Sequence, residues 1–397
     1  MTGIRRRAII AGAGIGGLTA AVALHGQDWD VTVLERAHRL DPVGTALGVG
    51  PNALHALDAI GLGDDVRRFS AIQGQGGIRR PGGRWLARTD LGAVADRFGD
   101  PQLMALRADL VGLLAGHLPD GALRTGVTVT GVTAGGPAQL ARMTTSAGDL
   151  DADLIVAADG IGSLIRTALF PGHPGPRSSG FTAWRFLAPA PGGNAVEPSE
   201  TWGSGRVFGV VPLGTGRVYC YASAATPASR PRGDETAELM RWFGAWHDPI
   251  PRLVGSVSPA DVLRDEVRWI AEPLPAYHAG RVAILGDAAH AMTPHLGQGA
   301  CQAIEDAVVL ASVAGRGSAP GSGPLDLAAY TTARLPRTRK VATASYRVTR
   351  LTGTTSRPVA GLRDAGLWLA GHLGPGLMLR QLAPVAGWLP PPLSQAT

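Results

Sequence analysis

Lysine is almost absent from this 397-residue chain: of its 37 lysine and arginine residues, only Lys340 is a lysine. A P-loop places a lysine on the bound phosphates, and the chain contains no Gly-Lys pair, so P-loop nucleotide chemistry is excluded. A pyridoxal phosphate enzyme needs a lysine for its Schiff base, and Lys340 lies in an arginine-rich run at residues 334–350. The scarcity of lysine therefore argues against both classes.

Cysteine is also scarce, since Cys220 and Cys301 are the only two. Two cysteines cannot build a disulfide framework or a cysteine-rich metal centre, so we expect no metal site and a reducing, cytoplasmic location. The net charge is +6, but it comes from scattered arginines rather than from a basic patch. We therefore expect no nucleic-acid partner.

Long hydrophobic runs are missing, apart from one imitation of a signal peptide at residues 5–24. There, three arginines precede an apolar stretch, but glycines interrupt it and a strand-like segment follows at residues 31–34. A second candidate at residues 362–389 is broken by charged residues, glycines and prolines. We expect no integral membrane segment.

The beginning of the chain predicts a βαβ unit. Residues 8–11 have the composition of a buried strand, residues 16–25 of an alanine- and leucine-rich helix, and residues 31–34 of a second strand. Glu35 closes that second strand, where a carboxylate can accept hydrogen bonds from ribose hydroxyls. The segment therefore has the strand, helix, strand and acidic residue of a dinucleotide-binding unit, in that order.

A glycine motif, Gly12-Ala13-Gly14-Ile15-Gly16-Gly17, joins the first strand to the helix and matches G-x-G-x-x-G. Gly12 would make the tight turn, Gly14 would let the backbone approach a pyrophosphate, and Gly17 would allow close packing of helix and strand. The amides of the helix N-terminus attract phosphates. The alternative is a purely structural turn. Because the motif opens the chain and two later motifs follow strand ends, it points to FAD rather than NAD.

These two later motifs are Asp159-Gly160, after the apolar residues 154–158, and Gly286-Asp287, after residues 282–285. Both place a carboxylate at the carboxyl end of a predicted parallel strand, where ligands of α/β sheets bind, although a strand-end Asp-Gly is also a common turn. Gly297-Gln298-Gly299 then opens a helix whose amides can face an isoalloxazine ring, and Pro294 shapes the approach.

The three motifs, in this order, resemble the class A flavoprotein monooxygenases, the para-hydroxybenzoate hydroxylase family, and in detail its salicylate hydroxylase-like branch. The segment Arg107-Ala108-Asp109-Leu110 is similar to the family's Arg-Ala-Asp-Leu, and residues 294–300 are similar to its flavin-proximal Pro-x-x-Gly-Gln-Gly loop. The resemblance implies an enzyme that uses FAD, O₂ and either NADH or NADPH, the nicotinamide docking only transiently. It would hydroxylate or epoxidise an aromatic, heteroaromatic or polyene small molecule through a flavin hydroperoxide.

The resemblance also implies roles for single residues. Glu35 would bind the adenosine ribose, and Arg107 would bind the phosphate and ribose region of FAD. Asp159 would lie near the pyrophosphate, where the nicotinamide cofactor approaches. Asp287 would bind the ribityl chain and the pyrophosphate. The complete set of expected cofactor-binding residues is Gly12, Gly14, Ile15, Gly17, Glu35, Arg36, Arg107, Asp159, Gly160, Gly286, Asp287, Pro294, Gly297, Gln298 and Gly299.

The expected substrate contacts lie on predicted strands. Alternate residues of a strand share a face, so Trp184 lies with residues 182 and 186, while Tyr219 and Tyr221 share a side. Either face would serve as the wall over the flavin, and ordinary sheet packing is the alternative. Arg185 would bind a substrate carboxylate, or lie on the surface. His295 is the expected catalytic base for a phenol or amine, with loop structure or substrate packing as the alternatives.

We therefore predict an α/β protein in which a mainly antiparallel substrate domain is inserted into a Rossmann-like FAD-binding domain, with a helical C-terminal segment and a monomeric or homodimeric state. The FAD-binding domain is expected at residues 1–70, 100–175 and 275–350, the substrate domain at 71–99 and 176–274, and the C-terminal segment at 351–397.

Three other functions are alternatives to this prediction. A flavin-dependent halogenase would carry Trp-x-Trp-x-Ile-Pro and a catalytic lysine, whereas residues 206–212 here read Arg-Val-Phe-Gly-Val-Val-Pro. A flavoprotein saturase or reductase acting on an isoprenoid remains open. A non-catalytic binding protein on the same fold has no evident need for Glu35, Asp159 and Asp287 together.

Overall fold

A computed structural model describes residues 5–40, 45–72, 74–192, 196–214, 216–226, 233–315, 325–372 and 383–393. At its centre lies a six-stranded sheet with the order β18-β19-β12-β1-β2-β8, in which all neighbours run parallel except β18 and β19. Its strands are short and apolar, as expected for a parallel sheet that is covered on both faces. In chain order they are β1 (Arg7–Ala11), β2 (Asp30–Glu35), β8 (Leu123–Thr125), β12 (Leu154–Ala157), β18 (His278–Ala279) and β19 (Val282–Ile284).

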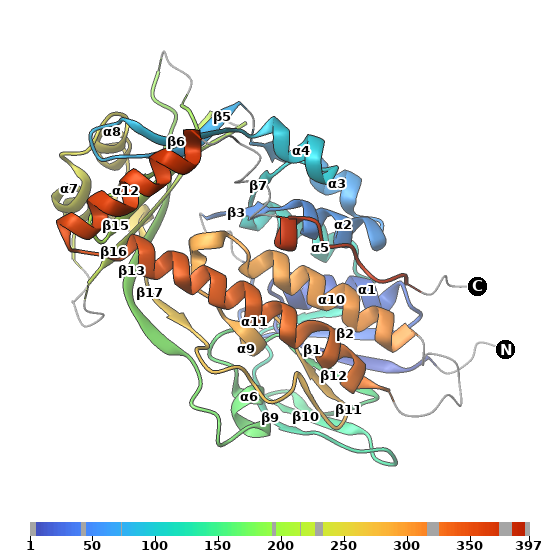
Figure 1. The fold of residues 1–397 in the computed structure, drawn as a ribbon. Coiled ribbons are helices and arrows are strands. Elements are labelled where there is room, and N and C mark those ends of the chain that lie inside the picture. The colour runs from blue at the N-terminus through green and yellow to red at the C-terminus, as the bar shows by residue number, and fades with distance from the viewer. Residues whose placement is uncertain are drawn as a thin grey trace.

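Helices cover one face of this sheet, and a small sheet lies on its other side (Figure 1). Helix α1 (Ile15–His25) packs closely on α10 (Gly299–Gly315): a Cβ at Gly16 would lie 3.0 Å from Cβ of Ala303 on α10. α2 (Pro51–Ala59) and α11 (Leu327–Thr352) flank α10, and α5 (Arg107–Gly116) flanks α1. The small sheet has the order β11-β10-β9, formed by β9 (Val129–Thr133), β10 (Ala141–Thr145) and β11 (Gly148–Ala152).

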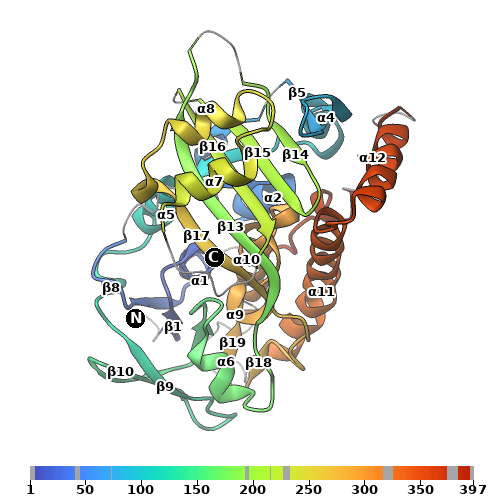
Figure 2. The ribbon, with the colours of Figure 1, turned by 90° about the vertical axis from the view of Figure 1, so that its left-hand side faces the viewer.

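The second large sheet has seven strands in the order β17-β13-β16-β15-β14-β5-β6, antiparallel except for β14 and β5. The long apolar-rich strands β13 (Arg177–Pro189), β15 (Arg206–Leu213) and β16 (Arg217–Ala225) form its middle. α7 (Glu235–Phe243) and α8 (Ile250–Gly255) cover its outer face (Figure 2). The remaining strands are β5 (Gln75–Arg79), β6 (Trp85–Asp90), β14 (Ser199–Trp202) and β17 (Leu263–Trp269).

A three-stranded sheet, β3-β7-β4, packs against α10 and against the seven-stranded sheet. Its strands are β3 (Ala46–Val49), β4 (Ser70–Ala71) and β7 (Leu103–Leu106), and Ala46 and Met104 pack in one cluster with Tyr219 and Leu213 of the seven-stranded sheet. The other short helices are α3 (Gly63–Arg67), α4 (Gly92–Phe98), α6 (Leu164–Leu169) and α9 (Asp287–His290), with 3₁₀ turns at Pro259–Asp261 and Pro294–Leu296.

The C-terminal segments contact both large sheets or the helices that cover them. α11 runs past the six-stranded sheet, and α12 (Arg357–His372) lies against β6 (Figure 1). Residues 383–393 return to the helices of the other half: Trp388 O accepts a hydrogen bond from His55 Nδ1 at 3.0 Å, and Pro384 O accepts one from Arg337 at 2.8 Å. In the part of the chain that the structure describes, no helix is both long enough and apolar enough to cross a bilayer.

The predicted fold class is confirmed: a Rossmann-like parallel sheet with helices is joined to a mainly antiparallel sheet and to C-terminal helices. Segments 75–90 and 177–269 contribute all strands of the seven-stranded sheet. The domain boundaries given above stay a prediction. Several elements were not predicted from the sequence, among them β14, β17 and α8.

Candidate active site

A cavity of about 690 Å³ lies between the two large sheets, in the size range of small-molecule sites. Its wall on one side is made by the glycine loop before α1, by Gly286-Asp287 and by the loop at residues 292–300. On the other side it is made by the inner face of the seven-stranded sheet. The carboxyl ends of β1, β12 and β19 thus open toward the same space, as the strand-end motifs predicted.

The glycine loop has almost no room for side chains on its inner side. Gly12 has φ +102°, and a Cβ there would lie 2.4 Å from the carbonyl oxygen of Ala158. A Cβ at Gly17 would lie 2.0 Å from the carbonyl oxygen of Gly12. Gly14, in contrast, lines the cavity, and the nearest atom to a Cβ there is a guanidinium nitrogen of Arg107 at 4.0 Å. The first turn of α1 has no side-chain cap, so its amides are available to an anion.

Glu35 binds the glycine loop on the side away from the cavity. Its carboxylate accepts hydrogen bonds from the amides of Ala13 and Ala37, each at 2.9 Å. Glu35 and Gly12 lie outside the set of residues that line the cavity, as does the exposed Arg36, whereas Gly14, Ile15 and Gly17 lie within it. A ribose-binding role for Glu35 stays a prediction.

The two strand-end aspartates, Asp159 and Asp287, differ in whether they line the cavity. The carboxylate of Asp159 accepts hydrogen bonds from Ser163 Oγ at 2.6 Å and from the amide of Ile165 at 3.2 Å, so it caps α6 and does not line the cavity, although Gly160 does. Asp287 is exposed and lines the cavity together with Gly286 and Arg107. The geometry therefore supports direct ligand contact by Asp287 more strongly than by Asp159.

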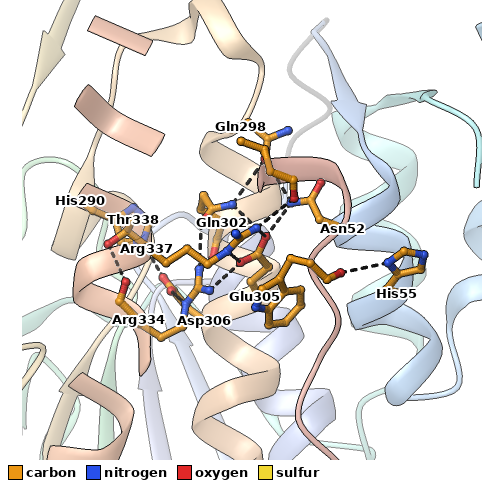
Figure 3. Close-up of polar contacts among 12 residues, drawn as sticks. Asn52, His55, His290, Gln298, Gln302, Glu305, Asp306, Arg334, Arg337 and Thr338 are labelled. Carbon is orange, nitrogen blue, oxygen red and sulfur yellow. Dashed lines mark hydrogen bonds and ion pairs between the residues drawn. The ribbon is translucent and has the colours of Figure 1, made fainter. Parts of the chain in front are cut away.

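The loop predicted to lie beside the flavin borders the cavity with Pro294, Gly297, Gln298 and Gly299. Pro294 begins a 3₁₀ turn that ends at Gly297, whose φ of +62° suits glycine. Gln298 is buried, and its side-chain oxygen accepts a hydrogen bond from Asn52 Nδ2 at 3.1 Å (Figure 3). The side chain of Gln298 thus fixes the loop to α2.

A buried ionic network supports this loop from below (Figure 3). Arg334 is completely buried and donates to Glu305 Oε2 at 2.5 Å and to Asp306 Oδ1 at 2.6 Å. Arg337 donates to both oxygens of Glu305. Asp306 also accepts from the amide of Gly286 at 2.9 Å and lies 2.5 Å from His290 Nε2. The network was not predicted, because residues 334–350 have the composition of a solvated basic helix.

The charges of this network compensate one another. Burial acts to raise the pKa of Asp306, but the interactions with His290 and Arg334 and the amide of Gly286 outweigh it and lower that pKa to about 2. Burial acts to lower the pKa of Arg334, and the two carboxylates raise it above its usual value. Asp306 and Arg334 thus stay ionised, and Asp306 gives the amide of Gly286 a fixed acceptor.

His295 faces the cavity but is poorly suited to act as a base. Its Nδ1 lies 2.9 Å from Thr349 Oγ1, its ring meets Phe181 edge to face, and its buried Nε2 has no hydrogen-bond partner among the described residues. Burial lowers the pKa of His295 to about 4. At neutral pH the imidazole is therefore uncharged and weakly basic, which favours a role in holding a ligand over proton abstraction.

The inner face of the seven-stranded sheet carries Arg185, Tyr219 and Tyr221, and all three line the cavity. The side chain of Trp184 lies on the opposite face of β13, which agrees with ordinary sheet packing, the alternative given for it above. Trp184 lies next to the cavity, but its indole is 1% exposed, packs with Phe186 on the outer face and donates to Glu235 Oε2 at 2.8 Å. The residues on the other face of β13 and β16 form the wall instead, because α7 and α8 cover the side to which Trp184 points.

Glu200 on β14 is a cavity residue that the sequence analysis missed. Its carboxylate accepts hydrogen bonds from Tyr221 Oη at 2.5 Å and Trp202 Nε1 at 2.8 Å. Burial raises the pKa of Glu200, against the effect of these two donors. The only sequence signal was the alternation in Ser-Glu-Thr-Trp at residues 199–202, which is typical of many edge strands.

These residues fit FAD. The loop at Gly12 to Gly17 leaves open space only where Gly14 faces the cavity, next to uncapped helix amides and Arg107. Asp287 offers a carboxylate to hydroxyl groups, and glycines 297 and 299 leave room for a flat ring to approach the backbone.

Comparison with known proteins agrees with this geometry. The model of the FAD binding domain family matches residues 5–345. The chain is 36% identical over 343 residues to the aurachin C monooxygenase/isomerase of Stigmatella aurantiaca, covering 86% of this chain and 88% of that protein. It is 32% identical over 326 residues to the FAD-dependent urate hydroxylase of Klebsiella pneumoniae, covering 77% of this chain and 81% of that protein.

Solved structures give the same result. The crystal structure of Klebsiella pneumoniae HpxO with FAD and uric acid superimposes with a TM-score of 0.86 at 27% identity, covering 96% of this chain and 97% of that one. A salicylate hydroxylase substrate complex, at 23% identity and a TM-score of 0.73 over 95% of this chain and 97% of that one, shares the fold. The chain therefore belongs to the FAD binding domain family and, within it, to the class A flavoprotein monooxygenases, which are oxidoreductases with FAD as their cofactor.

Proposed function

We propose that the protein uses NADH or NADPH and O₂ to insert one oxygen atom into an electron-rich aromatic or heteroaromatic small molecule. The observation that carries this proposal is one continuous cavity, which joins the glycine loop of α1 to the tyrosine-bearing wall of the seven-stranded sheet. A cofactor held at one end and a planar molecule held at the other would lie next to each other in it. Related proteins act on such rings: their names include urate hydroxylase and 3-amino-4-hydroxybenzoate 2-monooxygenase.

The cofactor half of the cavity binds and orients FAD. Gly14 and the first amides of α1 would receive the pyrophosphate, Arg107 would add a positive charge beside it, and Asp287 would accept from the ribityl hydroxyls. The backbone at residues 297–299 would border the flavin ring and offer amides to negative charge on it. When bound, FAD supplies the redox chemistry, accepting hydride from the nicotinamide and activating O₂.

The substrate half positions a ring and excludes water from the reaction. Val207, Val211 and Met104 give it apolar walls, and the tyrosines add hydroxyl groups at fixed places. Burial raises the pKa of Tyr219 to about 12 despite the nearby Arg185, so its hydroxyl stays protonated and able to donate. His295 enters the same space as a neutral imidazole. These groups hold the ring within reach of the cofactor rather than exchanging protons with bulk water.

We also propose the cytoplasm as the location, in keeping with two buried free cysteines, and a monomer or homodimer as the working form. The domain division given from the sequence is part of this proposal, with FAD held mainly by the six-stranded half.

The experiment is a cofactor and turnover assay. Purified protein should show flavin absorbance, and a screen of aromatic compounds should find one that accelerates NADH or NADPH oxidation. The product of that compound should be heavier by one oxygen atom. Colourless protein that ignores added FAD would contradict the cofactor assignment, and a reduced product without added oxygen would favour the saturase or reductase alternative.

A further inference from the structure

A carboxylate in the substrate half of the cavity has no role in the function proposed above. Glu200 lies on β14, and in the strand registers it is paired with Gly209 on β15, which is paired with Tyr221 on β16. The next residue in this row is Arg185 on β13. Glu200, Tyr221 and Arg185 therefore form one row across four neighbouring strands, on the face that lines the cavity.

Gly209 allows Glu200 and Tyr221 to meet although a strand separates them. A Cβ at residue 209 would lie 2.0 Å from Cζ of Tyr221, so the phenol ring passes directly over the glycine. Its hydroxyl then reaches Glu200 at 2.5 Å, and Trp202 donates to the other carboxylate oxygen at 2.8 Å. The position of the carboxylate is thus set by two donors and by the missing side chain at residue 209.

A carboxylate held in this way still has acceptor capacity. Each oxygen carries about two lone-pair sites, so two donors leave about half of the sites unused. Glu200 is only partly buried and lines the cavity, and a ligand that enters can therefore donate to it. An anionic group placed there would be repelled.

The positive charge at the other end of the row does not reverse this preference. Arg185 is ion-paired with Asp265, so its positive charge is already balanced and does not favour an aromatic carboxylate. Its remaining buried Nε, which has no hydrogen-bond partner in the described part of the chain, can donate to a neutral acceptor such as a ring carbonyl.

We infer that Glu200 determines substrate specificity: its carboxylate accepts a hydrogen bond from a ring N–H or O–H, so the cavity selects neutral heteroaromatic molecules with such a donor over aromatic carboxylates. This inference rests on the proposed function and names its substrate class. Tyr221 and Gly209 are positioning residues, since they act through Glu200.

The test measures the binding of three probes to the FAD-loaded protein: a matched pair of quinolones and one aromatic carboxylate. 2-Methyl-4(1H)-quinolone has the ring N–H, its N-methyl analogue lacks it, and salicylate supplies an aromatic carboxylate. Dissociation constants are measured by titration calorimetry and by the change in flavin absorbance. A hydrogen bond to a charged group is typically strong enough that wild type should prefer the N–H probe by roughly tenfold or more.

Glu200→Gln should reduce that preference to within about threefold and strengthen salicylate binding, because the negative charge is gone. Glu200→Asp, which keeps the charge but shortens the side chain, should retain part of the preference. Glu266→Gln, on the exposed edge strand β17, is the control and should leave all three constants unchanged. FAD content and unfolding midpoint are recorded for every variant.

The outcomes distinguish a failure of the role inferred for Glu200 from a failure of the proposed function. An unchanged probe preference in Glu200→Gln, tighter binding of salicylate than of the N–H quinolone by wild type, or no binding of either quinolone would each overturn the role of Glu200. Failure to bind FAD, or the absence of any compound that stimulates NAD(P)H oxidation, would count against the proposed function instead. If the protein binds FAD but no compound stimulates NAD(P)H oxidation, calorimetry with the probes still reports on Glu200, because it does not depend on turnover.

Discussion

Gly17 and Gly12 lie so close that a side chain at residue 17 would meet the carbonyl oxygen of residue 12, 2.0 Å from its Cβ. Gly17→Ala must therefore move the backbone of the glycine loop, and we expect it to lower the free energy of unfolding by about 2 kcal/mol or more. Gly14→Ala meets no atom closer than 4.0 Å and should leave stability nearly unchanged, but it should weaken FAD binding roughly tenfold by occupying space in the cavity.

Urea unfolding and equilibrium dialysis with FAD measure the two effects separately. Gly112→Ala, at an exposed position inside α5 with no atom within 4 Å, serves as the control and should stabilise the protein by about 0.5–1 kcal/mol. Equal effects of the substitutions at residues 14 and 17 on both measurements would show that the two glycines do not have different roles.

Arg334→Met should be strongly destabilising. It leaves Asp306 with only His290 and the amide of Gly286 and deprives Glu305 of one of its two arginines, both carboxylates being fully buried, and breaking such a pair typically costs about 3–5 kcal/mol. The free energy of unfolding measures this loss. Arg339→Met, at an exposed position on the same helix, should change it by less than about 0.5 kcal/mol. If the two variants were equally stable, the buried network would not contribute as its geometry indicates.

The stability of the protein should depend on His295 below pH 6.5. In the folded state its pKa is about 4, against 6.5 in the unfolded chain. The unfolded state therefore takes up a proton first, and stability falls as the pH drops from 6.5 toward 4, by roughly 3 kcal/mol at most. His295→Asn should remove this part of the pH dependence, as measured by urea unfolding at pH 5 and pH 7.5. A difference between wild type and variant that is the same at both pH values would contradict the lowered pKa.

The two strand-end aspartates should respond differently to replacement by alanine. Asp287→Ala removes an exposed carboxylate from the cavity wall, so we expect about tenfold weaker FAD retention with unchanged stability. Asp159→Ala removes the acceptor for Ser163 and Ile165, so it should cost about 1 kcal/mol of stability. Asp149→Ala, on an exposed hairpin, is the control. Loss of FAD in the Asp159 variant alone would reverse the assignment.

Much of the cofactor half could be predicted from the sequence, because local patterns determine it. Buried parallel strands such as β1 and β12 are continuous apolar runs, and the glycine motif requires backbone shapes that few other residues adopt. The fold class followed from these patterns and from the alternating strands. Element ends were accurate to a few residues where glycine or a change of polarity marks them.

The substrate half depends on pairings that the sequence does not reveal. Alternation separated Trp184 from Arg185, but both faces of the seven-stranded sheet are covered, so the pattern alone could not say which face meets the cavity. Glu200 matters because of Tyr221, and the two meet only across β15. Arg334 is buried only because α10 brings Glu305 and Asp306 against it.

The order of the central sheet also determines how this protein must be assembled during synthesis. β1 pairs with β12, about 150 residues later, and β12 pairs with β19, about another 130 residues later. At about 5–20 residues per second, a ribosome needs roughly 6 to 30 seconds for each interval, and during this time an apolar strand lacks its neighbour. The sheet that carries the glycine loop is therefore complete only after residue 284 has emerged, and until then its strand edges are exposed to aggregation.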